Sequence, residues 1–186
     1  ETHIADELMV LRVAIAAGET SSVVKLDNIR VRTPDGREYP PMDQAGLPIP
    51  RSAVIATPQA LISAVQMVGG LPIVIKLIRG TQGKGVVLAR NLATAAAVLK
   101  KVHAAKRQAL VQEFISEANG SDLRALIVDG QVIGAMKRQS REGDFRSNLH
   151  RGGKAEYVKL SEPELKLAIK AARALKLPVC GVDMLQ

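Results

Sequence analysis

Residues 71–89 constrain the fold more than any other part of the sequence, because they place a glycine-rich loop between two apolar, β-branched segments. Gly80, Gly83 and Gly85 let the backbone turn sharply and leave its N–H groups exposed. Residues 85–89 are rich in valine, which is typical of a strand rather than a helix. The pattern therefore predicts two strands joined by a glycine loop.

A loop of this kind suits a phosphate, because exposed backbone N–H groups bind anions, and Thr81, Gln82 and Lys84 add polar contacts. A Walker A loop would need four residues between its glycines, then Lys followed by Ser or Thr, then a helix. Here Lys84 is followed by glycine and a strand, so that motif is excluded. We expect instead a flap between strands that closes over phosphates.

Lys76 lies inside the apolar run before this loop. A strand with a buried appearance rarely contains a lysine unless the charge meets an anion, and a phosphate would serve. The alternative is a lysine on an edge strand that reaches water, followed by an ordinary hairpin turn. These residues alone leave both interpretations open.

The chain has 186 residues, of which 47% are hydrophobic, so it can bury a substantial core in one domain with a small appendage. Its 26 basic and 18 acidic residues give a net charge of +8, which favours anionic partners such as nucleotide phosphates, an acidic substrate or RNA-rich assemblies. Aromatic residues are scarce, which disfavours base stacking, so we expect no direct readout of nucleic acid.

Cys180 is the single cysteine, which excludes an internal disulfide, and its apolar surroundings favour a small core residue over a nucleophile. No apolar run is long enough for a membrane span, and no secretory leader is visible. We therefore expect a cytoplasmic protein without membrane contact.

Capping signals and apolar periodicity predict helices that begin at Thr57, Asn91 and Ser161. The first ends at Gly69-Gly70, and the third carries an apolar stripe of Leu165, Ile169, Ala172 and Leu175. Strands are predicted at 109–115 and 179–185, with a hairpin of 123–128 and 131–138 around Asp129-Gly130 and a polar loop over 140–154. This order is an α+β pattern with antiparallel pairs.

Residues 1–46 differ from the rest, with strand-like pieces around Thr33-Pro-Asp-Gly36 and a proline-rich connector that follows. They are too few for a full domain. We therefore divide the chain into an N-terminal segment, 1–46, and a main domain, 47–186.

Three further places could carry chemistry. Gln112-Glu113-Phe114 ends a strand and could hold an adenine, although a plain strand end is the alternative. Asp122 and Arg124 lie two apart and point to the same face, so they could pair or bind ribose and phosphate. Asp183 lies in an apolar strand, where a Mg²⁺ ion or an arginine would explain its charge.

The chain from about residue 47 closely resembles the ATP-grasp ligases, and within them the RimK-type enzymes. The resemblance rests on these motifs: Met67-Val-Gly-Gly70, Val74-Ile-Lys-Leu77, Gly80-Thr-Gln-Gly83, Val111-Gln-Glu-Phe-Ile115, Asp122-Leu-Arg124, Glu142-Gly-Asp-Phe-Arg-Ser-Asn-Leu-His-Arg-Gly-Gly153 and Gly181-Val-Asp183. It implies the ATP-grasp fold, in which ATP lies between two α+β lobes, with residues 1–46 as part of a pre-ATP-grasp domain.

The resemblance also implies roles for individual residues. Lys76 would contact phosphates, Asp122 the ribose, and Asp183 Mg²⁺ or Mn²⁺. Two neighbours would lie at the adenine hinge: Glu113 and Phe114. The mobile lid would be Gly80, Thr81, Gln82 and Gly83, and the nucleotide site would be completed by Arg146, Ser147 and Asn148.

By the same resemblance, the γ-phosphate passes to a substrate carboxylate, and an amine attacks the acyl-phosphate to form an amide. The arginines implied in this chemistry are Arg124, Arg138, Arg146 and Arg151. The expected reaction adds L-glutamate to the C-terminus of a ribosomal protein. A related ligase for an amino-acid carrier protein or a small acidic cofactor, or a nucleotide-binding module without ligase activity, are the alternatives. The sequence leaves homo-oligomer formation open.

In the family, the sequence continues past Asp183 into a Glu-x-Asn segment that supplies further metal ligands, and the first domain is longer than residues 1–46. We therefore expect this sequence to be a piece of a longer protein, with residues missing near Pro41-Met42.

Overall fold

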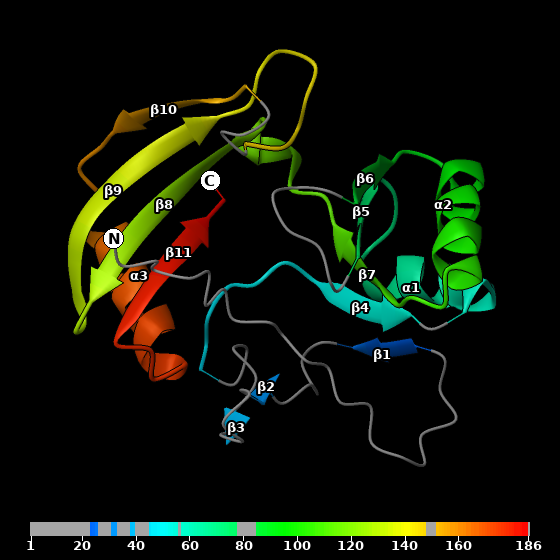
Figure 1. The fold of residues 1–186 in the computed structure, drawn as a ribbon, viewed down its shortest axis with the longest axis horizontal. Helices are drawn as coiled ribbons and strands as arrows, with labels where there is room; N and C mark the ends of the chain where they lie inside the picture. Colours follow the sequence, from blue (N-terminus) through cyan, green and yellow to red (C-terminus); the bar gives the residue numbers. More distant parts are fainter. Residues whose placement is uncertain are drawn as a thin grey trace, which may run out of the picture.

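The computed structural model describes residues 23–25, 31–32, 38–39, 45–55, 57–77, 85–147 and 152–185. Two antiparallel sheets, the first covered on one face by helices and the second by a single helix, form two lobes that lie side by side (Figure 1). A short 3₁₀ helix, η3 (Ser116–Ala118), lies on the connection between them. The predicted α+β architecture with antiparallel pairs is confirmed.

The first lobe contains a five-stranded sheet covered by three helices. Its strands are β1 (Val23–Lys25), β4 (Ser52–Ile55), β5 (Ile73–Leu77), β6 (Val86–Ala89) and β7 (Ala109–Glu113). Its helices are η2 (Pro58–Ala60), α1 (Leu61–Met67) and α2 (Leu92–Ala104). The strand order is β1, β4, β7, β5, β6, with every neighbouring pair antiparallel.

Side chains of this sheet alternate between two faces. One face packs against the helices, and its strand residues share a buried core with helix residues such as Leu61 and Leu99. These strand residues are Ala53, Ile55, Ile73, Ile75, Ala109 and Val111. The opposite face carries the alternate residues, among them Ser52, Lys76 and Gln112. A polar set therefore lies on the face that the helices leave uncovered.

The helix limits of the first lobe follow the predicted signals. The Oδ1 atom of Asn91 caps α2 by accepting a 2.8 Å hydrogen bond from the N–H of Thr94. Helix α1 ends before Gly69 and Gly70, whose φ angles of 92° and 105° favour glycine. Thr57 is the N-cap of η2, although its side chain makes no capping hydrogen bond.

The second lobe contains a four-stranded sheet with one helix on one of its faces (Figure 1). Its elements are β8 (Ser121–Val128), β9 (Gln131–Gln139), β10 (Lys154–Tyr157), α3 (Glu162–Ala174) and β11 (Val179–Met184). The strand order is β10, β9, β8, β11. Helix α3 packs on β8 through Ala168 and Ala172, which meet Leu123, Ala125 and Ile127 in the core.

Two local signals of the second lobe are confirmed. The hairpin of β8 and β9 turns at Asp129 and Gly130, whose φ angles of 46° and 75° are those of a tight two-residue turn. At the start of α3, the N–H of Ser161 donates a 2.6 Å hydrogen bond to Oε2 of Glu164, as a capping box requires.

The structure also differs from the sequence-based expectation. Strands β4 and β10 were not predicted: β4 is four residues long, and all four residues of β10 are exposed, so neither shows the alternation that marks a strand. Leu165 is 39% exposed, so its predicted place in the buried stripe of α3 is wrong, whereas Ala172 and Leu175 of the same stripe are buried. Strand β8 begins at Ser121 rather than at residue 123, which places Asp122 inside the sheet.

Two short strands, β2 (Val31–Arg32) and β3 (Glu38–Tyr39), pair in the N-terminal segment, and the turn predicted at Thr33-Pro-Asp-Gly36 lies outside the described residues. Strand β1, from the same segment, pairs with β4 of the first lobe. Of the helices in the described residues, none has the length and apolar character needed to cross a membrane.

Candidate functional site

Lys76 lies on the helix-free face of the first sheet, in strand β5. Its Nζ atom donates a 2.6 Å hydrogen bond to Oε1 of Gln112 in the neighbouring strand β7. Gln112 is held in turn, because its Nε2 atom donates to Oγ of Ser52 in β4 at 2.7 Å. The Ser52 hydroxyl donates to the carbonyl of Pro50 at 2.9 Å. We call Lys76, Gln112 and Ser52 the amide network.

The charge of Lys76 has no carboxylate partner among the described residues, since its contact is to a neutral amide. Burial lowers the pKa of Lys76 below its ordinary value, because removal from water disfavours the charged form. A buried ammonium without a counter-ion is costly. The site therefore has the electrostatic character of a place that receives an anion.

Glu113, at the end of β7, is bound to the segment before β4. Its carboxylate accepts from the backbone N–H of Arg51 at 2.8 Å and from Nε of the same residue at 2.6 Å. The guanidinium of Arg51 also lies against Gly69, where a Cβ would collide with it. The side chain of Glu113 thus fixes the strand end, whereas the predicted adenine contact of Glu113 and Phe114 stays a prediction.

A loop that follows β9 reaches from the second lobe to the first. The rings of Phe114 and Phe145 meet edge to face with centroids 6.0 Å apart. Nη1 of Arg146 donates a 3.4 Å hydrogen bond to the carbonyl of Val86, which lies opposite Lys76 in the pairing of β5 and β6. Arg146 also binds Asp144 through two hydrogen bonds of 2.8 Å. The loop therefore brings a second cation beside the strand position of Lys76.

Asp122 and Arg138 form a buried ion pair between β8 and β9. Nε and Nη2 of Arg138 bind the two carboxylate oxygens of Asp122 at 2.7 and 2.5 Å. Ser147 donates to Oδ2 of Asp122 at 2.7 Å, which joins the same loop to the sheet. Asp122 is only 7% exposed. Its carboxylate is thus occupied by two protein partners, and its predicted ribose contact stays a prediction.

Asp183 in β11 lies between two arginines. Both of its oxygens accept 2.6 Å hydrogen bonds from Arg124, and Oδ2 lies 3.1 Å from Nη2 of Arg138. Burial opposes the charge of Asp183, but the hydrogen bonds and charges of Arg124 and Arg138 outweigh it and lower its pKa.

Asp122 and Arg124 share a face as predicted, yet each pairs with another residue: Asp122 with Arg138, and Arg124 with Asp183. We call Asp122, Arg124, Arg138 and Asp183 the charge cluster.

The described residues do not form a metal site by themselves. They contain no group of three His, Cys, Asp or Glu side chains that could hold an ion. Asp183 is the carboxylate predicted to bind Mg²⁺, and both of its oxygens already accept from arginine. A lone carboxylate in a bidentate ion pair does not match the oxygen-rich coordination that Mg²⁺ prefers. The carboxylate of Asp183 is thus occupied by arginine here, and its predicted role as a Mg²⁺ ligand stays a prediction.

Several predicted site residues lie outside the described residues: Gly80, Thr81, Gln82, Gly83, Asn148 and Arg151. Sequence reasoning missed Arg51, Ser52 and Asp144. Only the strand register places Ser52 beside Gln112, and an unpredicted strand, β4, carries it. Arg51 gave no signal beyond its charge, whereas Asp144 belongs to the motif of residues 142–153 but was given no role of its own.

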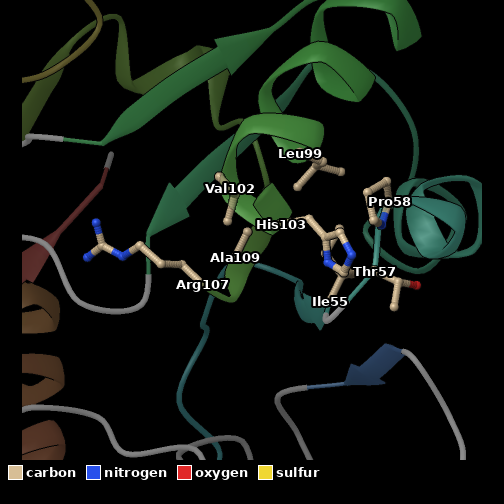
Figure 2. Close-up of a pocket in the computed structure, with 8 residues that line it drawn as sticks. All are labelled: Ile55, Thr57, Pro58, Leu99, Val102, His103, Arg107 and Ala109. Carbon is tan, nitrogen blue, oxygen red and sulfur yellow. The ribbon is translucent and has the colours of Figure 1, made fainter. Parts of the chain in front are cut away.

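A pocket elsewhere in the first lobe is separate from these residues (Figure 2). Leu99, Val102 and His103 of α2 line it together with Ile55 and Ala109 of the sheet. Its cavity volume of about 10 Å³ leaves room for about one water molecule. Because Ile55 and Ala109 belong to the helix-covered face, the pocket lies across the sheet from Lys76.

The charge cluster yields a test with matched variants. Arg138→Met removes a guanidinium that is 5% exposed and leaves Asp122 buried, so we expect a loss of about 3–5 kcal/mol in the free energy of unfolding. Arg124→Met breaks a pair whose side chains are 44% and 43% exposed, so the loss should be about 1 kcal/mol or less. Denaturant unfolding measures both, and equal losses would contradict the assignment of Asp122 and Arg138 as the buried pair.

Comparison with known proteins places this geometry in a family. A family model described as a RimK-like ATP-grasp domain matches residues 41–186. A "Probable alpha-L-glutamate ligase" of Teredinibacter turnerae is 50% identical over 145 residues, which cover 78% of this chain and 48% of that protein. The chain thus spans about half the length of the relatives it matches.

Solved structures agree with the fold. The RimK domain ATP-grasp protein from Sphaerobacter thermophilus has a TM-score of 0.60 at 22% identity, over 78% of this chain and 51% of that chain. The ATP-grasp ligase PsnB, complexed with a minimal precursor, Mg and ADP, has a TM-score of 0.57 at 23% identity, over 76% of this chain and 41% of that one. The two lobes have the predicted ATP-grasp fold, and the chain belongs to the RimK-like ATP-grasp domain family.

Proposed function

We propose that this domain binds ATP between its two lobes and serves a ligase that joins a carboxylate to an amine. The observation that carries the proposal is the Lys76 ammonium, which is partly buried, held in place by a neutral amide, and without a carboxylate partner among the described residues. A phosphate would supply the missing negative charge at this position.

The second lobe supports the same position for the phosphates. Arg146 reaches the backbone carbonyl of Val86, the residue paired with Lys76 across β5 and β6, so it lies beside the strand position of Lys76. Asp144 orients the Arg146 guanidinium through both carboxylate oxygens. Guanidinium and ammonium groups held ready in this way stabilise a transferring phosphoryl group without reorganisation during the reaction.

The residues around this position have supporting roles. The edge contact of Phe114 and Phe145 joins the end of β7 to the loop of the second lobe, which would shield a nucleotide from water. The ion pair of Asp122 and Arg138 fixes that loop through Ser147. Bound ATP would supply the phosphoryl group that activates a carboxylate for attack by an amine. The chain's residues would position the reactants and balance the developing charge.

Glutamate is the amino acid we propose for the reaction, because relatives at 47–50% identity carry the name "Probable alpha-L-glutamate ligase". The C-terminus of a ribosomal protein is the proposed acceptor, since the motif of residues 142–153 resembles the RimK subgroup. The net charge of +8 suits a ribosome-associated acceptor. An amino-acid carrier protein or a small acidic cofactor is the alternative acceptor.

A nucleotide-binding module without ligase activity is the second candidate function. The observation that favours it is that both oxygens of Asp183, the carboxylate predicted to bind Mg²⁺, accept hydrogen bonds from Arg124. A carboxylate whose two oxygens are bound by arginine offers few free oxygen ligands to a metal ion that accompanies the nucleotide. Nucleotide binding through Lys76 is common to both candidates, whereas amide formation separates them.

Lys76→Met tests nucleotide binding. Methionine keeps the length of the side chain and removes the charge, so we expect ATP affinity to fall by about tenfold or more, the loss of one charge-assisted contact. The free energy of unfolding should stay equal or rise, because a desolvated charge is removed. Calorimetric titration measures the ATP affinity, and denaturant unfolding measures the free energy of unfolding. A destabilised variant with unchanged ATP affinity would make Lys76 a structural residue.

Amide formation is tested with ATP, Mg²⁺ and L-glutamate; Mg²⁺ is included because PsnB was solved with Mg and ADP. We expect a ribosomal protein with an intact C-terminus to gain the mass of glutamyl residues, and the same protein without its C-terminal residues to gain none. A carrier protein and a glutamate-containing cofactor serve as parallel acceptors. ATP binding without a mass increase in any acceptor would favour the module without ligase activity.

A further inference from the structure

We propose that Gln112, oriented by Ser52, is a positioning residue that aims the Lys76 ammonium at a phosphate while leaving its positive charge uncompensated. This inference rests on the proposed function, because it concerns the group that would meet the phosphates. It assigns a role to two residues, Gln112 and Ser52, that do not themselves need to touch the nucleotide.

The direction of the hydrogen bonds supports the proposal. An ammonium can only donate, so the Gln112 oxygen must face Lys76, and the 2.6 Å contact is to Oε1. The amide nitrogen then faces Ser52, whose hydroxyl accepts from it at 2.7 Å and donates to the Pro50 carbonyl at 2.9 Å. In each of these three contacts a donor faces an acceptor. The amide network therefore has a single consistent orientation.

The strand register explains why three strands are needed. Gln112 lies opposite Ser52 in β4 and opposite Val74 in β5, so Lys76 is its diagonal neighbour on the same face. Ser52 is 5% exposed, which gives the network a fixed end in the sheet. Lys76, at the other end, is less buried than Ser52. Through these hydrogen bonds the sheet restricts the orientation of the long Lys76 side chain.

The neutrality of Gln112 is the decisive chemical feature. A glutamate at position 112 would fit the same space and would hold the ammonium more strongly, but it would also neutralise the charge. The contrast lies within the same protein: both carboxylates of the charge cluster are bound by arginines. A neutral amide at Lys76 keeps the charge available for a ligand.

The charged groups near Lys76 are few among the described residues. The described side chains on its face of the sheet, from β4, β5, β6 and β7, include no other titratable group. From the second lobe come Arg146 and Asp144, which bind each other. A change in the charge of residue 112 should therefore act mainly on Lys76.

Two variants of Gln112 separate positioning from simple packing. In Gln112→Glu we expect the pKa of Lys76 to rise, because an opposite charge favours the ammonium, and ATP affinity to fall by about tenfold or more. In Gln112→Met we expect the pKa of Lys76 to fall, because an acceptor is lost, and ATP affinity to fall by about three- to tenfold. Gln131→Glu, on the exposed start of β9, is the matched control and should change neither.

The pKa of Lys76 is followed by NMR through its Cε and Hε resonances during a pH titration without nucleotide, and ATP affinity is measured by calorimetry. Opposite pKa shifts in the two variants, with weaker ATP binding in both, are the expected result. Unchanged pKa values, or shifts of the same sign, would overturn the role of Gln112. If the unmodified protein binds no ATP, the proposed function and the phosphate assignment both fail, while the pKa comparison still decides whether Gln112 controls the charge of Lys76.

Discussion

The charge of Lys76, which has no carboxylate partner among the described residues, is the constraint on which the rest of the site depends. Strand β5 is apolar except for Lys76. The side-chain amide of Gln112 fixes the position of the Lys76 ammonium without neutralising its charge. The helix-covered face of the same sheet supplies the apolar core that makes such a cost tolerable. The apolar core on one face thus stabilises a sheet whose other face carries the charge that we propose binds a phosphate.

In the charge cluster of the second lobe, unlike at Lys76, each charge is paired with an opposite charge. Asp122, Arg138, Asp183 and Arg124 alternate in sign and bind one another, so the charge cluster is balanced internally. Such a cluster gives the sheet a defined arrangement and, through Ser147, fixes the loop that carries Arg146. The loop then meets the first lobe at Val86 and Phe114. The second lobe, whose charge cluster is paired internally, therefore places the Arg146 guanidinium beside the strand position of Lys76.

Much of this organisation could be predicted from the sequence, because it depends on local signals. Asn91 and Asp129-Gly130 mark a helix start and a hairpin turn by their own chemistry, and the spacing of Leu61, Val65 and Val68 marks a buried helix face. The partners of the charges could not be predicted, because they depend on strand order. Asp183 meets Arg124 only because β11 pairs with β8, and Gln112 meets Ser52 only because the unpredicted strand β4 lies beside β7.

The most direct test of the account is the pKa of Lys76 with and without ATP, followed by NMR on the unmodified protein. Without nucleotide the pKa should lie below the ordinary value for lysine, because burial disfavours the charge. With saturating ATP it should rise, because phosphate oxygens supply the missing counter-charge. A pKa that stays unchanged while ATP binds would contradict the central claim, since the nucleotide would then be held without Lys76.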